Sequence, residues 1–273
     1  MTPLAAMSLA PAVTMGAVFG SFMSVVVVRV PPLVLDSTGG RVRLARLLST
    51  LSWPGSHCTR CNTALRWWDN IPLLSYIALR GRCRSCHAAY GGKYVLLEAG
   101  GAAAGLASAW LYGWSAQGTL CFVLLSLLLV LSAIDLEEML LPDVLVLPLL
   151  PLGLFYQSWY GGGLVSAGLG AVAAFAVMWA IGASYRLARK IDGMGGGDIK
   201  LAGALGAWLG IANIPFFLIC AFACGTLIMS AHLLIRKSGS GQPLPFGPFL
   251  ALSAAVFVMM PQTTAFLTAL LAP

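Results

Sequence analysis

The stretch GTLCFVLLSLLLVLSAIDLEE, residues 118–138, decides the fold. It runs through seventeen apolar or small residues, from Gly118 to Ile134, before its first charged side chain, Asp135. A helix needs about 17 to 25 such residues to cross the hydrocarbon layer of a bilayer. Lipid-facing strands of a β-barrel would alternate polar and apolar residues, and this stretch does not. It therefore predicts a membrane-spanning helix that ends in a carboxyl group.

Comparable apolar stretches recur along the whole chain of 273 residues. Hydrophobic residues make up 59% of it and charged residues only 9%, whereas a soluble domain carries about a quarter charged residues. The sequence therefore predicts an all-α polytopic membrane protein with about eight transmembrane helices. We expect these spans at about residues 4–28, 94–113, 117–134, 144–160, 163–185, 199–212, 214–235 and 248–271.

The basic residues indicate how these spans are oriented. The net charge is +7, and ten of the sixteen Lys and Arg residues lie between Arg29 and Lys93. Basic loops mark the cytoplasmic side of a membrane protein, so an orientation signal explains the charge better than a nucleic-acid partner. We expect a multi-pass protein of the inner-membrane type, in contact with the lipid bilayer, with its N-terminus outside the cytoplasm and no nucleic acid bound.

Residues 29–93 form the one segment without a long apolar run, and we call them the four-cysteine module. The chain would then consist of a first transmembrane helix (1–28), this cytoplasmic module (29–93) and a transmembrane bundle (94–273). About sixty residues with so few aliphatic side chains usually need a staple to stay folded. We therefore expect the four-cysteine module to be a small insert that is stabilised by a bound zinc ion.

The staple is predicted from two Cys-x-x-Cys pairs that are separated by 21 residues. Four thiolates at this spacing suit a tetrahedral zinc ion and close its coordination sphere, which indicates a structural metal. Disulfides or a redox pair are the alternative, and the cytoplasm disfavours them. His57 and His87 flank the two pairs. Either histidine can replace a cysteine ligand, but we expect both to be exposed neighbours of the metal site. The four predicted ligands are Cys58, Cys61, Cys83 and Cys86.

Two carboxyl groups stand out among the nine acidic residues. Asp135 follows an apolar run, and Asp198 closes the glycine-rich sequence GMGGGD (193–198) before another apolar segment begins. Two carboxyls that share a site can divide into one ionised and one protonated group, which is the acid–base pair of an aspartic protease. Helix capping by Asp143 or Asp198 is a sufficient alternative for each residue. A proton-coupled transporter that uses the same aspartates, or a non-catalytic scaffold, also remains open at this point.

Six blocks in order make the chain similar to the type IV prepilin peptidase/N-methyltransferase family, a group of GxGD intramembrane aspartyl proteases. The resemblance extends from Gly20 to about Leu250. Its blocks are Gly20-Ser21-Phe22, the two cysteine pairs with WDNIPLLSY (68–76) between them, Ile134-Asp135 with Leu141-Pro142-Asp143, GMGGGDIK (193–200) and PLPFGPF (243–249).

The resemblance implies that Asp135 and Asp198 are catalytic, with Asp143 as the competitor for the first role. Family members cut the leader from prepilins or type II secretion pseudopilins at the cytoplasmic face. Many also methylate the new N-terminus with S-adenosylmethionine, an activity linked to the four-cysteine module. Gly91, Lys93 and Glu98 match the block tied to that activity, and a helix-start role is the alternative for Glu98.

The chain departs from the family pattern at a few positions. Ser24 stands where Asn is usual, Val95 where Pro is usual, Lys93 where Arg is usual and Asp192 where Glu is usual. Ser24 and Val95 lie beside the four-cysteine module, so the departures concern methylation more than cleavage. The choice between pilins and pseudopilins, and the oligomeric state, are left open by the sequence.

Overall fold

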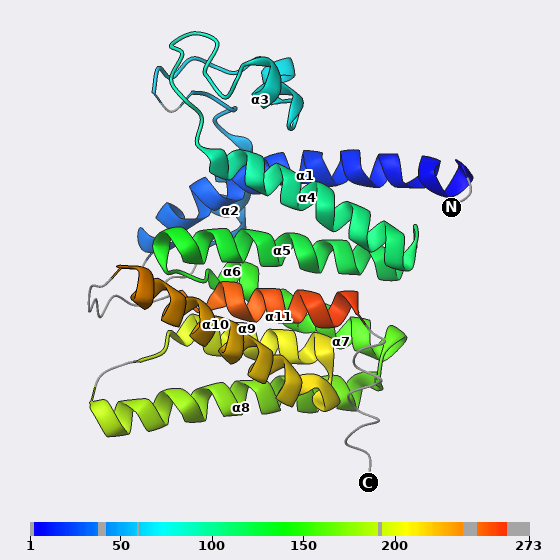
Figure 1. Ribbon diagram of the computed structural model, residues 1–273, viewed down its shortest axis with the longest axis vertical. Coiled ribbons are helices and arrows are strands. Elements are labelled where there is room, and N and C mark those ends of the chain that lie inside the picture. Colours follow the sequence, from blue (N-terminus) through cyan, green and yellow to red (C-terminus); the bar gives the residue numbers. More distant parts are fainter. Residues whose placement is uncertain (1–2, 38–41, 59, 191–192, 237–244, 261–273) are drawn as a thin grey trace. The chain divides into compact units, whose positions relative to one another are not determined.

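The computed structural model describes residues 3–37, 42–58, 60–190, 193–236 and 245–260 (Figure 1). Within these ranges the regular structure is helical, and two isolated bridges are the only strand-like pairs. The predicted all-α fold is therefore confirmed. The chain divides into two compact units, residues 1–130 and 131–273, and each is described by itself.

The first unit contains two long helices that pack on one another, α1 (Pro3–Leu35) and α4 (Gly92–Tyr112). Between them come α2 (Leu44–Ser52), the short helix η2 (Trp67–Asn70) and α3 (Leu74–Ala78). Glycines allow the close packing: a methyl group on Gly20 would lie 2.6 Å from the Cα atom of Glu98. Small residues spaced four apart commonly bring membrane helices together in this way. Helix α5 (Ala116–Glu138) then leads into the second unit.

Helix α1 continues seven residues beyond its predicted end at residue 28 and includes Pro31 and Pro32. The charge of Arg29 does not end the helix, because its guanidinium donates hydrogen bonds to the carbonyl oxygens of Thr50 and Pro54, at 2.8 and 2.6 Å.

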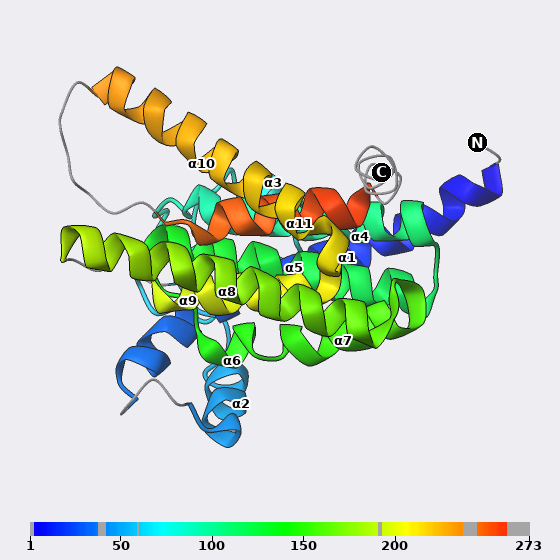
Figure 2. The same ribbon diagram turned by 90° about the horizontal axis from the view of Figure 1, so that it is seen from below.

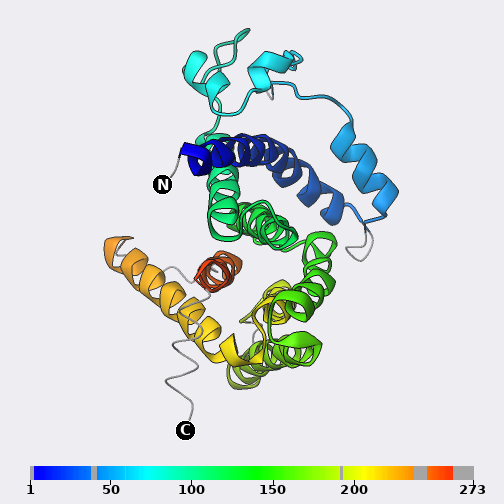
Figure 3. The ribbon, with the colours of Figure 1, turned by 90° about the vertical axis from the view of Figure 1, so that its right-hand side faces the viewer.

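The second unit is built around α9 (Gly196–Leu209), which packs against α7 (Leu149–Tyr160) and α8 (Gly163–Arg189). Every residue of α9 from Leu201 onward is buried, and Figure 2 shows α8 running alongside α9. The Trp208 indole donates to the Leu149 carbonyl at 2.8 Å, which ties α9 to α7. The remaining elements are α6 (Asp143–Val146), η3 (Ile211–Asn213), α10 (Ile214–Arg236) and α11 (Gly247–Met259). Figure 3 shows α11 (red) beside α10 (orange).

Five of the described helices are long and apolar enough to cross a membrane. They cover Leu9–Leu35, Gly92–Tyr112, Ala116–Glu138, Gly163–Arg189 and Ile211–Ala231. The fourth predicted span is broken at Leu147-Pro148, since proline cannot donate a backbone hydrogen bond, and α7 then reaches only about 18 Å. The last predicted span extends to residue 271, and residues 261–273 lie outside the described part. The count of eight spans stays a prediction.

Candidate active site

Asp135 lies in the last turn of α5, which ends at Glu138 because Met139 adopts a positive φ of 50°. Asp135 is buried, with 4% of the residue exposed. Its Oδ2 atom accepts a hydrogen bond of 2.9 Å from the backbone N–H of Gly247, the first residue of α11. A methyl group at residue 247 would lie only 2.7 Å from that oxygen. Glycine at this position therefore lets α11 begin directly against the carboxylate.

Asp198 lies in the first turn of α9, whose N-cap is Gly195. Its Oδ1 atom is buried and has no hydrogen-bond partner among the described residues. A buried polar atom without a partner is costly and points to a water or ligand at that place. Asp198 is also close enough to Asp135 for the two carboxyl groups to interact electrostatically. The two aspartates predicted from the sequence are thus brought into one site.

Leu141 lies where the three segments of this site meet. A methyl group on Gly197 would fall 2.9 Å from the Leu141 Cβ atom, and one on Gly247 would fall 3.3 Å from its Cδ2 atom. The loop after α5, the glycine run before α9 and the start of α11 therefore converge on one side chain. Sequence reasoning assigned no role to Leu141 or Gly247. Gly247 lies in the PFGPF block, whose glycine between aromatic and proline residues was the available signal.

Asp143, the competitor for the first catalytic position, has a different environment. Both of its carboxylate oxygens accept hydrogen bonds of 2.8 Å from the Lys200 ammonium group. The two side chains are 43% and 45% exposed, so this is a surface ion pair. Pro142 occupies the N-cap position of α6, so the capping role considered for Asp143 is wrong. The pair joins the loop after α5 to α9 beside Asp198.

The four predicted metal ligands of the four-cysteine module lie together. The Sγ atoms of Cys58, Cys61, Cys83 and Cys86 are all within 4.8 Å of one another. The Cys58–Cys86 and Cys61–Cys83 sulfur distances are 3.8 and 3.9 Å. Zinc–sulfur bonds of about 2.3 Å in a tetrahedron place sulfurs roughly 3.8 Å apart, so this set of thiols fits a closed zinc site.

The two cysteine pairs share the same local structure. In each, the N–H of the first cysteine binds a carbonyl five residues later: Cys58 to Thr63 at 2.9 Å and Cys83 to Ala88 at 2.8 Å. Backbone N–H groups of Cys86 and Ser85 lower the pKa of Cys83 to about 6. A thiolate at neutral pH is the form that binds metal. His57 and His87 are both exposed and lie outside this cluster of sulfur atoms.

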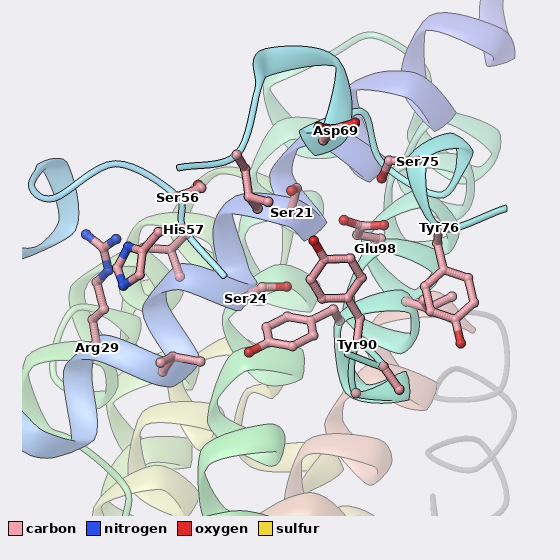
Figure 4. Close-up of a pocket in the computed structure, with 17 residues that line it drawn as sticks. Ser21, Ser24, Arg29, Ser56, His57, Asp69, Ser75, Tyr76, Tyr90 and Glu98 are labelled. Carbon is pink, nitrogen blue, oxygen red and sulfur yellow. The ribbon is translucent and has the colours of Figure 1, made fainter. Parts of the chain in front are cut away.

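A pocket lies in the first unit between α1, the four-cysteine module and α4 (Figure 4). Of the three residues predicted for the cofactor, Gly91 and Glu98 line this pocket and Lys93 does not. The ammonium group of Lys93 lies 5.8 Å from the ring centre of Tyr94, which is a lining residue. Glu98 is the seventh residue of α4, so a helix-start role is wrong for it. The full lining is Ser21, Ser24, Val25, Val28, Arg29, Ser56, His57, Leu65, Asp69, Ser75, Tyr76, Ala89, Tyr90, Gly91, Tyr94, Val95 and Glu98.

The Glu98 carboxylate also holds the four-cysteine module on α4. Its Oε2 atom accepts a hydrogen bond of 2.8 Å from the N–H of Leu73, a residue with a φ of 60°. Ser24 and Val95, two of the four departures from the family pattern, line the same pocket. Asp192, another departure, lies outside the described residues. The pocket thus combines carboxylates with the tyrosine rings of Tyr76, Tyr90 and Tyr94, groups that attract a cationic ligand.

Two protein-family models match the chain. The bacterial peptidase A24 N-terminal domain matches residues 14–112, which include the four cysteines and the pocket. The type IV leader peptidase family matches residues 122–230, which include Asp135 and Asp198.

Curated relatives match along nearly the whole chain. A prepilin leader peptidase/N-methyltransferase of Burkholderia pseudomallei is 40% identical over 260 residues, or 91% of this chain and 84% of the relative. Proteins of the same name from Pseudomonas aeruginosa and Aeromonas hydrophila are 37% and 38% identical. They cover 90% and 88% of this chain, and 88% and 86% of their own length. No solved structure matches the chain.

Proposed function

The chain belongs to the type IV leader peptidase family, and we propose that it removes the leader peptides of type IV prepilins or of type II secretion pseudopilins. It is an aspartic peptidase with N-methyltransferase activity, since its relatives carry both names over nearly its whole length. Nothing in these relatives supports the alternative of a proton-coupled transporter. The observation that carries the peptidase assignment is the electrostatic interaction of Asp198 with Asp135, in segments that meet where Gly197 and Gly247 approach Leu141.

In the proposed mechanism a water molecule lies between the carboxyl groups of Asp135 and Asp198. The ionised carboxyl takes a proton from the water, while the protonated one polarises the scissile carbonyl. The Gly247 N–H fixes Oδ2 of Asp135, and the unpartnered Oδ1 of Asp198 is available to the water. The glycines before Asp198 carry no side chain that would keep the substrate backbone away.

The experiment for both activities uses the full-length protein in detergent, a prepilin and S-adenosylmethionine. Mass spectrometry of the product should show loss of the leader and addition of one methyl group at the new N-terminus. A product that keeps its leader after prolonged incubation with wild-type protein would refute the peptidase assignment. A product without its leader but also without the methyl group would refute only the transferase assignment.

Gly247→Ala is expected to reduce leader cleavage about 10²-fold, because the new methyl group displaces the Asp135 carboxylate from its position. Gly168→Ala is the matched control: a Cβ atom at residue 168 in α8 meets nothing within 4 Å. The measurement compares the cleavage rates of the two variants at equal amounts of folded protein. Equal rates for both would remove the Gly247 contact from the mechanism.

The pocket of Figure 4 is the proposed site of methyl transfer. S-adenosylmethionine supplies a sulfonium-bound methyl group for the freed amine. The rings of Tyr90 and Tyr94 would hold the sulfonium cation, and Glu98 would hold the amino group of the donor. Gly91 would let the donor approach the backbone closely. Lys93 does not line the pocket; its proposed role is to hold the ring of Tyr94, which its ammonium group contacts.

Glu98→Gln is expected to lower methyl transfer at least about tenfold and to leave leader cleavage unchanged. Glutamine keeps an acceptor for the Leu73 N–H but removes the negative charge that a cationic donor requires. Asp36→Asn is the control, because Asp36 is an exposed acid of the same module outside the pocket. Methylation of a precleaved pilin, measured by mass spectrometry, separates the two activities. Full methylation by Glu98→Gln would place the donor elsewhere.

We further propose that the four cysteines bind zinc and that this zinc is structural. The protein would lie in the bacterial inner membrane, with a periplasmic N-terminus and with both sites at the cytoplasmic face. The concentration of basic residues between Arg29 and Lys93 supports this orientation. A leader peptide that remains in the cytoplasm would then reach the aspartates directly.

A further inference from the structure

Helix α2 (Leu44–Ser52) presents an apolar side that no described residue covers. Leu47 is buried, and α2 contacts α1. Leu44 and Leu48, one turn apart, are 66% and 56% exposed, and the adjacent Trp53 is 78% exposed. A leucine pair with a neighbouring tryptophan is typical of helices that lie in the membrane–water interface.

The stretch of sequence that contains α2 carries only basic charges. Arg43 precedes the helix and Arg46 lies within it, and both are exposed. Arg41 adds a third positive charge, and the sequence from Ser37 to His57 contains no acidic residue. A second copy of this helix would be repelled by such a segment. An anionic surface would attract it.

The contacts of Arg29 fix the depth at which α2 lies. Residues 1–28 carry no charged side chain, so Arg29 is the first charge after an apolar stretch of α1 that is long enough to cross the hydrocarbon layer. Arg29 therefore lies at the boundary between hydrocarbon and headgroups. Its guanidinium binds the carbonyls of Thr50, in α2, and of Pro54, just beyond Trp53. These two hydrogen bonds hold the C-terminal end of α2 at the level of Arg29.

We propose that α2 lies in the headgroup layer of the membrane and binds anionic phospholipids. Leu44, Leu48 and Trp53 enter the boundary of the acyl chains, and Arg43 and Arg46 contact lipid phosphates. Each arginine strengthens binding to an anionic surface about fivefold. The lipid contact would hold the four-cysteine module at the membrane surface, independently of either catalytic activity.

The test is hydrogen–deuterium exchange of the full-length protein in lipid nanodiscs. Amides of residues 44–53 should exchange at least about fivefold more slowly in discs with 30% phosphatidylglycerol than in pure phosphatidylcholine. Leu44→Glu/Leu48→Glu should remove this protection. Ala45→Glu/Ser49→Glu is the matched control: it adds the same charge at the same spacing, but on a different face of α2, and should retain most of the protection.

Equal exchange of α2 in neutral and anionic discs would overturn the proposal. So would protection that arises only on addition of a prepilin, or only at high protein concentration, since these outcomes identify a substrate or a second copy as the partner. Loss of protection in both double variants would show that added charge alone, and not the leucine face, governs the effect, and would also overturn it. Unchanged exchange of α4 amides in all variants verifies that the protein is folded.

Discussion

Asp198→Asn is expected to lower leader cleavage on the order of 10⁴-fold or more. The amide cannot act as a general acid or base near neutral pH, and its position in the first turn of α9 stays the same because asparagine has nearly the same shape. Oδ1 of Asp198 has no partner among the described residues, and the hydrogen bond that the carboxylate accepts from the Gly195 backbone can also be accepted by the asparagine carbonyl. The loss of cleavage would therefore reflect the missing acid–base group and not a change in structure.

The measurement is the initial rate of leader removal, followed by mass spectrometry in detergent or nanodiscs. Methylation of a precleaved pilin serves as the control, because the proposed donor site lies in the other unit. Wild-type cleavage by Asp198→Asn would exclude a catalytic carboxyl at this position. Loss of both activities together would indicate misfolding, and Asp198→Glu would then separate chemistry from structure by restoring folding without full cleavage.

Cys83→Ser is expected to have the largest effect on stability, with loss of the bound zinc ion and unfolding of the four-cysteine module. Structural zinc contributes about 10–16 kcal/mol of apparent binding free energy in small domains, which exceeds what so small a core can supply. Serine leaves three thiols and opens the coordination sphere. Because Ser56, His57, Ala89 and Tyr90 line the pocket beside the cysteine pairs, methyl transfer should fall with the metal.

The zinc content is measured by mass spectrometry, and the folding of the module is measured by amide exchange of residues 56–90. Cys220→Ser is the matched control, because Cys220 is an exposed free thiol in α10 outside the cluster. Wild-type protein should contain one zinc ion per chain and Cys83→Ser none. A wild-type protein without zinc but with a stable module would contradict the assignment. Leader cleavage should survive in Cys83→Ser, since Asp135 and Asp198 belong to the other unit.

Much of the fold could be predicted because its signals are local. The apolar run from Gly118 to Ile134 lies within α5, whose observed ends are Ala116 and Glu138. The spacing of the cysteine pairs likewise predicted the sulfur cluster. The break at Pro148 was also a local signal, but the apolar character of the surrounding residues concealed it. Length and composition alone therefore overestimated the continuity of the fourth span.

The rest of the site depends on contacts between distant residues, which no local pattern reveals. Gly247 donates to Asp135 across 112 residues, and Lys200 binds Asp143 across 57 residues. Glu98 accepts a hydrogen bond from the N–H of Leu73 across 25 residues, although the sequence also suggested a helix-start role for it. The assignments of Asp135, Asp198, Gly91, Lys93 and Glu98 to their functions stay predictions until variants are measured.

The most direct test of the central claim compares Asp135→Asn with Asp143→Asn in one cleavage assay. The two residues belong to the same sequence block, but one carboxylate is buried against Gly247 and the other pairs with Lys200 at the surface. Intact mass spectrometry of a prepilin should show no leader removal by Asp135→Asn and nearly wild-type removal by Asp143→Asn. Cleavage by Asp135→Asn together with an inactive Asp143→Asn would contradict the account and move the catalytic pair to Asp143 and Asp198.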